Sequence, residues 1–176
     1  IICEFVRGGP HINVVKEVVT GNAEFGICGA DQVIIAKDKN IPIKAIAVVF
    51  KDSPVCFFAK SESNIKSPYD FVGKRIGMQY GTNVHTEYIA MLRRLDIDRN
   101  KITEYPSSMD IQKFISGEVD IWNGYLFNEP LIAIESGLSI NLIVPSKYGI
   151  NMYADCLITT NELIESNPSL VNNLIG

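Results

Sequence analysis

The sequence has few of the residues from which metal and redox centres are built. Its 176 residues include only four cysteines and two histidines. No two cysteines are close enough for a Cys-x-x-Cys motif, and no zinc-like spacing occurs, so we expect no metal site. The cysteines lie among apolar residues, as in Phe25-Gly26-Ile27-Cys28, which favours buried free thiols. Disulfides remain open, because four cysteines allow three full pairings.

Basic residues and long apolar runs are also scarce. The chain has 16 Lys and Arg against 20 Asp and Glu, a net charge of −4. Nucleic-acid binders normally carry a basic excess or stripe, so we expect no nucleic-acid partner. The longest apolar run, Ala45–Phe50, has strand length and falls far short of the roughly 18 residues of a membrane helix. We therefore expect no membrane insertion by this segment.

The chain does not begin with methionine. It opens in an apolar, strand-like segment, Ile1–Val6, and ends in a helical pattern at Leu174–Gly176. We interpret it as a segment of a longer protein. A signal peptide or membrane anchor outside the segment would not be visible here.

Strand-like and helix-like segments alternate along the chain, which predicts an α/β fold with parallel βαβ units. Ser67-Pro68-Tyr69-Asp70 predicts a helix start, because Ser caps, Pro fits the first turn and Asp accepts from the cap amide. Asp31 can cap one helix, and Ser107 or Ser108 another. We expect strands at 1–6, 23–28, 43–50, 55–59, 75–78, 102–105, 119–122, 140–144 and 156–159, and helices at 12–20, 32–38, 84–95, 111–116 and 128–136, with two closing helices after Thr160 and Asn167.

Two stretches resemble each other. Val19-Thr20-Gly21-Asn22-Ala23-Glu24-Phe25 and Ile115-Ser116-Gly117-Glu118-Val119-Asp120-Ile121 both end a helix and lead into a strand, a helix and another strand. The period is too long for a solenoid and indicates two similar α/β lobes. Open sheets bind ligands beyond the carboxyl ends of their strands. The residues after the strands, at 29–32, 80–83 and 123–129, are therefore the candidates for a site.

The candidate positions offer both hydrogen-bond donors and a carboxylate acceptor to a ligand. Free N–H groups at Gly81-Thr82-Asn83 can hold an acceptor or an anion, and Gly29-Ala30-Asp31 repeats this arrangement. A carboxylate at Glu129 beside Asn and Tyr suits a neutral heteroaromatic ligand better than an anion. Glu129 can instead merely flank its helix, Tyr80 can pack in the core, and Tyr148 can pack at a hinge. We predict ligand binding by Asp31, Gln32, Tyr80, Gly81, Thr82, Asn83, Asn123, Tyr125, Glu129 and Tyr148.

Three motifs carry a family resemblance. The first is Ser67-Pro68-x-Asp70-x-x-Gly73-Lys74-x-Ile76-Gly77-x-x-x-Gly81-Thr82. The second is Ser116-Gly117-Glu118-Val119-Asp120, followed by Gly124-Tyr125-x-x-Asn128-Glu129-Pro130. The third is Tyr148-Gly149-Ile150-x-x-Tyr153-x-Asp155-x-Leu157-x-Thr159-Thr160. Together they resemble the type II periplasmic binding protein fold, and within it the family that binds thiamine pyrimidine precursors. Family members are substrate-binding proteins of ABC importers or extracytoplasmic sensor domains of kinases and cyclases.

The resemblance implies a two-lobed clamshell whose lobes each hold a mixed, mostly parallel sheet flanked by helices. Lobe 1 would comprise 1–57 plus 151–176, lacking its first βα unit, and lobe 2 would comprise 58–150. The expected function is binding without chemistry or cofactor. A small-molecule ligand such as a thiamine pyrimidine precursor would close the domain. The partner would be an ABC importer permease or a covalently linked signalling domain, such as a histidine kinase or diguanylate cyclase.

Departures from the family keep other functions open. The family often places a Trp two to three residues before the acid, whereas Leu126-Phe127 stands there and the only tryptophan is Trp122. A small anion such as a sulfonate is one alternative ligand. An enzyme of pyrimidine synthesis is another alternative, although the cysteine-rich signature of that branch has no counterpart here. Catalysis by His11 or His85 would need a base-orienting triad, and none is legible.

Overall fold

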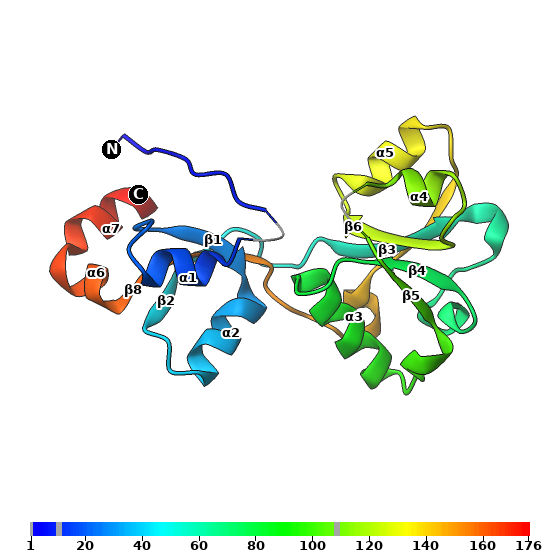
Figure 1. Cartoon of the computed structure of the whole chain (residues 1–176), viewed down its shortest axis with the longest axis horizontal. Coiled ribbons are helices and arrows are strands. Elements are labelled where there is room, and N and C mark those ends of the chain that lie inside the picture. Colours follow the sequence, from blue (N-terminus) through cyan, green and yellow to red (C-terminus); the bar gives the residue numbers. More distant parts are fainter. Residues whose placement is uncertain (1, 10–11, 108–109) are drawn as a thin grey trace. The chain divides into compact units, whose positions relative to one another are not determined.

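The structure is a computed structural model that describes residues 2–9, 12–107 and 110–176. The contacts of the chain divide it into two compact units (Figure 1). The first unit combines the N-terminal part up to Asp52 with Met152–Gly176, and the second unit is Ser53–Asn151. The chain therefore passes from one unit to the other twice, and each unit is described by itself.

The first unit is built on a three-stranded sheet of order β1-β8-β2. Its core includes Val15, Val18, Ile43 and Ile158, which the helices and strands bury together. The strands are β1 (Gly26–Gly29), β2 (Ile43–Val48) and β8 (Asp155–Thr160), and the helices are α1 (Val14–Val19), α2 (Ala30–Asp38), α6 (Asn161–Ser166) and α7 (Pro168–Ile175).

The expectation of mostly parallel pairing is wrong for this sheet. β8 pairs antiparallel with both β1 and β2. β1 and β2 therefore run parallel to each other, as a βαβ connection through α2 requires. They are not neighbours, because β8 returns from the far end of the sequence and lies between them. The pairing of a strand that distant in sequence could not be deduced from the alternation of segments.

Three further expectations for the first unit need correction. The described part of the predicted strand at 1–6 is not a strand, and Ile2, Phe5 and Val6 are largely exposed. A strand needs a neighbour for its N–H and C=O groups, and the described residues give this segment none. Cys3, predicted to be buried, is exposed there. Helix α2 begins at Ala30 with Gly29 as its N-cap, so Asp31 lies inside the first turn and does not cap it.

The second unit is built on a five-stranded sheet of order β5-β4-β6-β3-β7. β4 pairs parallel with β5 and β6, while β3 pairs antiparallel with β6 and β7. β3 makes these pairings along its length, so Val55–Phe57 belong to this unit. The strands are β3 (Val55–Lys60), β4 (Arg75–Met78), β5 (Thr103–Pro106), β6 (Ile121–Tyr125) and β7 (Ile140–Ile143), and the α-helices are α3 (Asn83–Arg94), α4 (Gln112–Ile115) and α5 (Glu129–Glu135). The described residues of the second unit also form four 3₁₀ helices: η1 (Ser61–Ser63), η2 (Pro68–Phe71), η3 (Arg99–Lys101) and η4 (Pro145–Tyr148).

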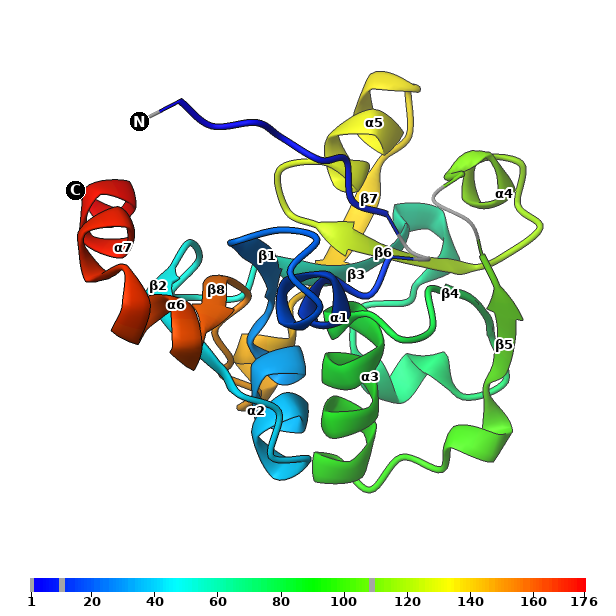
Figure 2. The ribbon, with the colours of Figure 1, turned by 60° about the vertical axis from the view of Figure 1, so that its left-hand side comes forward.

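Helices cover both faces of the second sheet, with α3 on one side and α4 and α5 on the other (Figures 1 and 2). Adjacent residues of β3 point to opposite faces. Phe57 packs against Phe71 and Tyr88 on the α3 side, with ring centroids 5.9 and 5.8 Å away. Phe58 packs against Phe114 at 5.0 Å, in a buried cluster with Trp122. Aromatic side chains thus fix both layers on the sheet.

Several local predictions are confirmed in the second unit. Ser67 and Asp70 form the expected capping box at the start of η2. β4 has the predicted bounds, and α3 begins at Asn83, one residue before the predicted start, with Thr82 as its N-cap. For the helix predicted at 111–116, Asp110, and not Ser107, accepts the backbone amide of Gln112. The other predicted cap, Ser108, lies outside the described residues.

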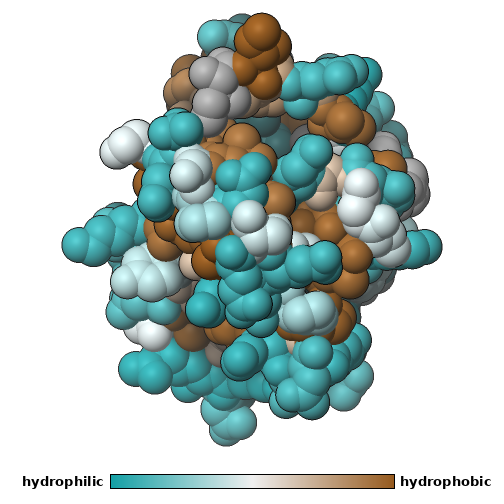
Figure 3. All heavy atoms as spheres, turned by 90° about the vertical axis from the view of Figure 1, so that its left-hand side faces the viewer, coloured by the Kyte–Doolittle hydropathy of each residue, from teal (hydrophilic) through white to brown (hydrophobic). Residues whose placement is uncertain are grey.

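The surface seen in Figure 3 mixes hydrophobic and hydrophilic residues. Exposed apolar side chains of the first unit include Ile27, Ile34 and Val49. Within the described ranges, no helix combines the length and the apolar character needed to cross a membrane.

Candidate functional site

Two helices begin at one edge of the second sheet. β4 and β6 are parallel neighbours, so their carboxyl ends lie at the same edge. Helix α3 follows β4 and helix α5 follows β6. The N-termini of these helices therefore flank the strand ends, where most of the predicted ligand-binding residues of this unit are found.

Asn83 and Tyr125 are joined at this edge. The Asn83 side-chain amide donates to the Tyr125 hydroxyl at 2.9 Å. The Tyr125 ring meets Phe127 edge-on, with centroids 5.7 Å apart, and Phe127 is 54% exposed. β6 extends to Tyr125, so Asn123 and Tyr125 lie within the strand. The prediction that they follow the strand is therefore wrong. The result is a partly open aromatic pair with an amide beside it.

Glu129 lies on the opposite face of β6. Its carboxylate oxygen Oε2 accepts the backbone N–H of Tyr125 at 2.9 Å, and the residue is only 7% exposed. A Cβ atom at Gly124 would lie 2.1 Å from that oxygen, so only glycine leaves room for the carboxylate. Burial, and then the charge of Glu129, raise the pKa of the nearby Cys56 thiol to about 12. Glu129 thus holds the backbone on which Tyr125 is carried.

The first turn of α3 already contains its own acceptors. The side-chain oxygen of Asn83 accepts the N–H of Val84 at 3.0 Å, and the Thr82 hydroxyl accepts that of His85 at 3.5 Å. Gly81, just before, has a φ of 79°, in the left-handed region that favours glycine. An anion at this helix end would compete with these side chains for the amides.

Asn123 is buried on the same face as Tyr125. Its amide nitrogen donates to the carbonyl of Gly77 across the β4–β6 pair. Its oxygen Oδ1 has no hydrogen-bond partner among the described residues and is shielded by them. A buried acceptor costs free energy unless a ligand or water satisfies it.

Tyr80 belongs to a separate group, which we call the Arg99–Glu104 cluster and which also includes His85. The Tyr80 hydroxyl donates to Glu104 at 2.9 Å, and its ring meets His85 at 5.0 Å. The Arg99 guanidinium binds Glu104 through two nitrogens and lowers the pKa of that carboxyl. Burial and then Arg99 lower the pKa of His85. The polar atoms of Tyr80 and Arg99 are thus directed to Glu104. The other histidine considered for catalysis, His11, lies outside the described residues.

Tyr148 lies at the other end of α3. Its carbonyl accepts from Nε of Arg94, the last residue of the helix, at 3.0 Å. The eleven steps from Asn83 to Arg94 span about 17 Å along the helix axis. Burial and the nearby Asp70 raise the pKa of Tyr148. The structure therefore does not bring Tyr148 together with Tyr125.

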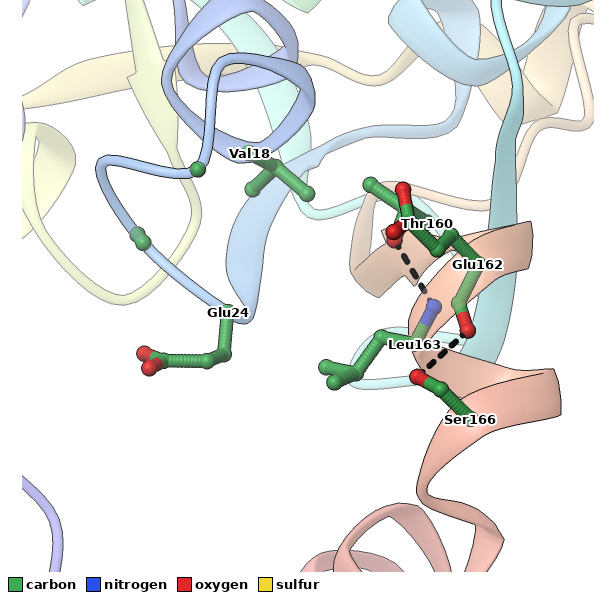
Figure 4. A pocket seen from close by; sticks show the side chains of 8 residues that line it. Val18, Glu24, Thr160, Glu162, Leu163 and Ser166 are labelled. Atoms are coloured by element: carbon green, nitrogen blue, oxygen red, sulfur yellow. Dashed lines mark hydrogen bonds between the residues drawn. The ribbon is translucent and has the colours of Figure 1, made fainter.

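Asp31 and Gln32 are in the first unit. Asp31 is 3% exposed, and the Gln32 amide donates to it at 3.3 Å. Gln32 also lines a hollow of about 390 Å³ between α1 and α2. A smaller hollow of about 150 Å³ lies beside α6 (Figure 4), where Thr160 accepts from Leu163, and it includes none of the predicted site residues. In the part of the chain that is described, His, Cys, Asp and Glu form no group of three or more that could hold a metal ion.

Two residues of the candidate site in the second unit lie within the candidate stretch 123–129 but were not among the ten residues predicted to bind the ligand. Phe127 completes the aromatic pair, and its position two residues after Tyr125 was visible in the sequence. Gly124 contributes by lacking a side chain, which the alternation of faces along β6 could have indicated.

Known proteins share this fold. The periplasmic aliphatic sulphonate binding protein SsuA from Escherichia coli superposes with a TM-score of 0.75 at 16% identity, over 91% of this chain and 55% of that one. SsuA from Xanthomonas axonopodis pv. citri, bound to MOPS, gives 0.69 at 18% identity, over 96% and 57%. These likenesses confirm the two-lobed α/β fold of type II periplasmic binding proteins.

Sequence comparison agrees with the fold. The riboflavin-binding protein RibY from Chloroflexus aurantiacus is 22% identical over 158 residues, which are 89% of this chain and 45% of RibY. The chain thus spans about half the length of these relatives. A family model described as NMT1/THI5 like matches residues 2–176, and the chain therefore belongs to the NMT1/THI5-like family.

Proposed function

We propose that the chain is part of an extracytoplasmic solute-binding protein whose second unit binds a small, neutral heteroaromatic compound, such as a pyrimidine precursor of thiamine. Family membership and the SsuA-like fold support the solute-binding class. The protein would deliver its ligand to an ABC importer permease or transmit binding to an attached kinase or cyclase domain. No bond of the ligand is made or broken.

One observation carries the choice of a neutral ligand. The N-terminus of α3 is supplied with side-chain acceptors from the protein itself, and α5 begins with a carboxylate. Asn83 and Thr82 accept first-turn amides of α3, and the Glu129 carboxylate lies at the start of α5. A negative charge brought to this edge would meet the charge of Glu129 and find the α3 amides engaged.

The aromatic pair favours a flat ligand. The exposed part of Phe127 and the ring of Tyr125 offer apolar surface, and an added ring contact contributes about 0.5–1.5 kcal/mol beyond burial. RibY is described as binding riboflavin, which is also heteroaromatic. The ligand-binding role of Asp31 and Gln32 in the first unit stays a prediction.

A sulfonate is the second candidate, because the SsuA structure from Xanthomonas contains bound MOPS. A melting experiment with the protein distinguishes the two classes. A ligand at a hundredfold excess over its Kd stabilises the folded state by about 2.7 kcal/mol. We expect hydroxymethylpyrimidine or a related pyrimidine to raise Tm and MOPS to leave it unchanged.

A shift with MOPS alone would reverse the assignment. Mass spectrometry of the incubated ligand tests the absence of chemistry, and turnover would favour the enzyme class. Glu129→Gln tests the role of the carboxylate. Unchanged pyrimidine binding would show that the charge of Glu129 is not needed for binding.

A further inference from the structure

Two buried cysteines of the first unit face each other across a strand pair. Cys28 of β1 and Cys156 of β8 are directly opposite in the antiparallel register. Side chains of opposite residues lie on the same face, and their Cα atoms are about 4.5–5.5 Å apart. A disulfide forms at Cα separations of about 4.4–6.8 Å. The register therefore places the two Cα atoms within the range of separations that a disulfide spans.

The two thiols share one apolar environment. Cys28 is 7% exposed and Cys156 is 2% exposed, and both belong to the core cluster with Val15, Val18 and Ile158. Burial raises the pKa of Cys28 to about 12, and Cys156 is the next cause. The thiols are thus close enough to affect each other, and a disulfide would remove two poorly solvated S–H groups from the core.

A bond between them would join distant parts of the sequence. Cys28 lies in the N-terminal part of the first unit, whereas Cys156 lies in Met152–Gly176, and the whole second unit stands between them. The other cysteines have no such neighbour: Cys56 is opposite Gly124, and Cys3 is exposed outside the sheets. Only the Cys28–Cys156 pair is brought together by strand register among the described residues.

We propose that Cys28 and Cys156 form a disulfide that links β1 to β8 when the protein folds in an oxidising compartment. Its presence in the cell depends on the extracytoplasmic location proposed above, whereas its geometry does not. The thiolate of one cysteine attacks the disulfide of a small-molecule or protein oxidant and releases one thiol. The second cysteine then attacks the mixed disulfide and releases the other thiol, so that two electrons and two protons pass to the oxidant. Because both thiols are buried in the folded unit, the exchange precedes its final packing.

Refolding in a glutathione redox buffer tests the geometry. The reduced, unfolded protein with Cys3→Ser, which prevents links between molecules, is refolded. It is then denatured in the presence of N-ethylmaleimide, so that buried free thiols react, and digested for mass spectrometry. We expect a cross-linked peptide pair containing Cys28 and Cys156, with N-ethylmaleimide on Cys56. Both cysteines alkylated in the refolded protein, or either one linked to Cys56, would overturn the proposal.

Matched variants and a stability measurement complete the test. Cys56→Ala should keep the cross-link, and Cys156→Ala should abolish it and leave Cys28 alkylated. The oxidised protein should melt at a higher temperature than the same protein after reduction, because the link restricts the unfolded chain. A lower melting temperature would contradict a link that fits the native register. Thiol trapping in intact cells tests the compartment separately: a pair that links in vitro but stays reduced in cells contradicts the proposed location and not the geometry.

Discussion

At the scale of single residues, the candidate site depends on a glycine, Gly124, whose missing side chain leaves room for a carboxylate. Gly124 leaves space on one face of β6, and the carboxylate of Glu129 occupies it to accept the amide of Tyr125. A hydrogen bond between a charged group and a backbone N–H contributes about 1.5–3 kcal/mol. The position of the Tyr125 ring is therefore linked to a residue on the other side of the strand.

Gly124→Ala should disturb this arrangement. The new Cβ would overlap the carboxylate, which must move and give up its bond to Tyr125. We expect the free energy of unfolding to fall by about 2 kcal/mol, measured by urea titration, and ligand affinity to fall at least tenfold. Gly8→Ala is the control, since nothing lies within 4 Å of a Cβ at that position. Wild-type affinity in a folded Gly124→Ala protein would show that Glu129 does not position the site.

The sequence indicated for only some of the predicted site residues that they lie together, and the reason is local. Asn83, Tyr125 and Glu129 follow from the order strand, turn and helix start, which places them at one sheet edge. Tyr80 is also next to that turn, but its hydroxyl reaches Glu104 on a strand distant in sequence. Tyr148 is near the end of α3, and no pattern in the sequence indicates which end of that helix it would meet.

At the scale of elements, an ion pair joins the beginnings of β4 and β6. The Asp120 carboxylate accepts from Nε and Nη2 of Arg75, and also from the Arg75 backbone amide at 2.9 Å. The Arg75 side chain also donates to the carbonyl of Gly117. These bonds, led by the one from the Arg75 side chain, lower the pKa of Asp120 below its usual value. They fix the two parallel strands whose far ends carry the candidate site.

Asp120→Asn should weaken the acid sensitivity of stability. Because the pKa of Asp120 is lower in the folded state, its contribution is complete above the unfolded value near 3.8 and is lost as pH falls through the folded value. The variant should be less stable than wild type at pH 7, and the difference should shrink below about pH 4. Urea titrations from pH 7 to pH 3 measure this, with the neighbouring exposed acid changed in Glu118→Gln as control. A difference that stays constant across this range would contradict the assignment.

The contact between Gly77 of β4 and the ring of Trp122 on β6 gives a second prediction at this scale. A Cβ at Gly77 would lie 2.4 Å from the fully buried indole. Gly77→Ala should therefore cost about 1–3 kcal/mol in urea unfolding. A red shift of the Trp122 emission should accompany the loss if the ring is displaced. An unchanged free energy of unfolding would mean that the strands can separate at no cost.

The limits of prediction at the scale of elements follow from pairing. Helix starts such as Ser67–Asp70 are encoded within a few residues and were found. The order of strands is not local: β8 enters between β1 and β2 after the whole second unit. The segment at 2–6 has apolar, strand-like residues but no neighbour to pair with in the described structure, so strand propensity alone misassigned it.

At the scale of the whole molecule, two units on one chain should be distinguishable in unfolding. The only tryptophan, Trp122, is buried in the second unit. Tryptophan fluorescence therefore reports on that unit, while far-UV circular dichroism reports on both. We expect a bound pyrimidine to move the fluorescence transition upward, by the linkage between binding and folding. A ligand that shifts only the circular dichroism transition would place the binding site outside the second unit.

The central claim is that the second unit binds a neutral heteroaromatic ligand through Tyr125 and its neighbours. Isothermal titration of the protein with hydroxymethylpyrimidine, in parallel with MOPS, tests it most directly. The account predicts saturable heat for the pyrimidine and none for MOPS. Tyr125→Ala should bind the pyrimidine at least tenfold more weakly. The control Tyr69→Ala, at an exposed tyrosine of the same unit, should bind it as wild type does. Saturable heat for MOPS alone, or equal pyrimidine affinity in Tyr125→Ala, would contradict it.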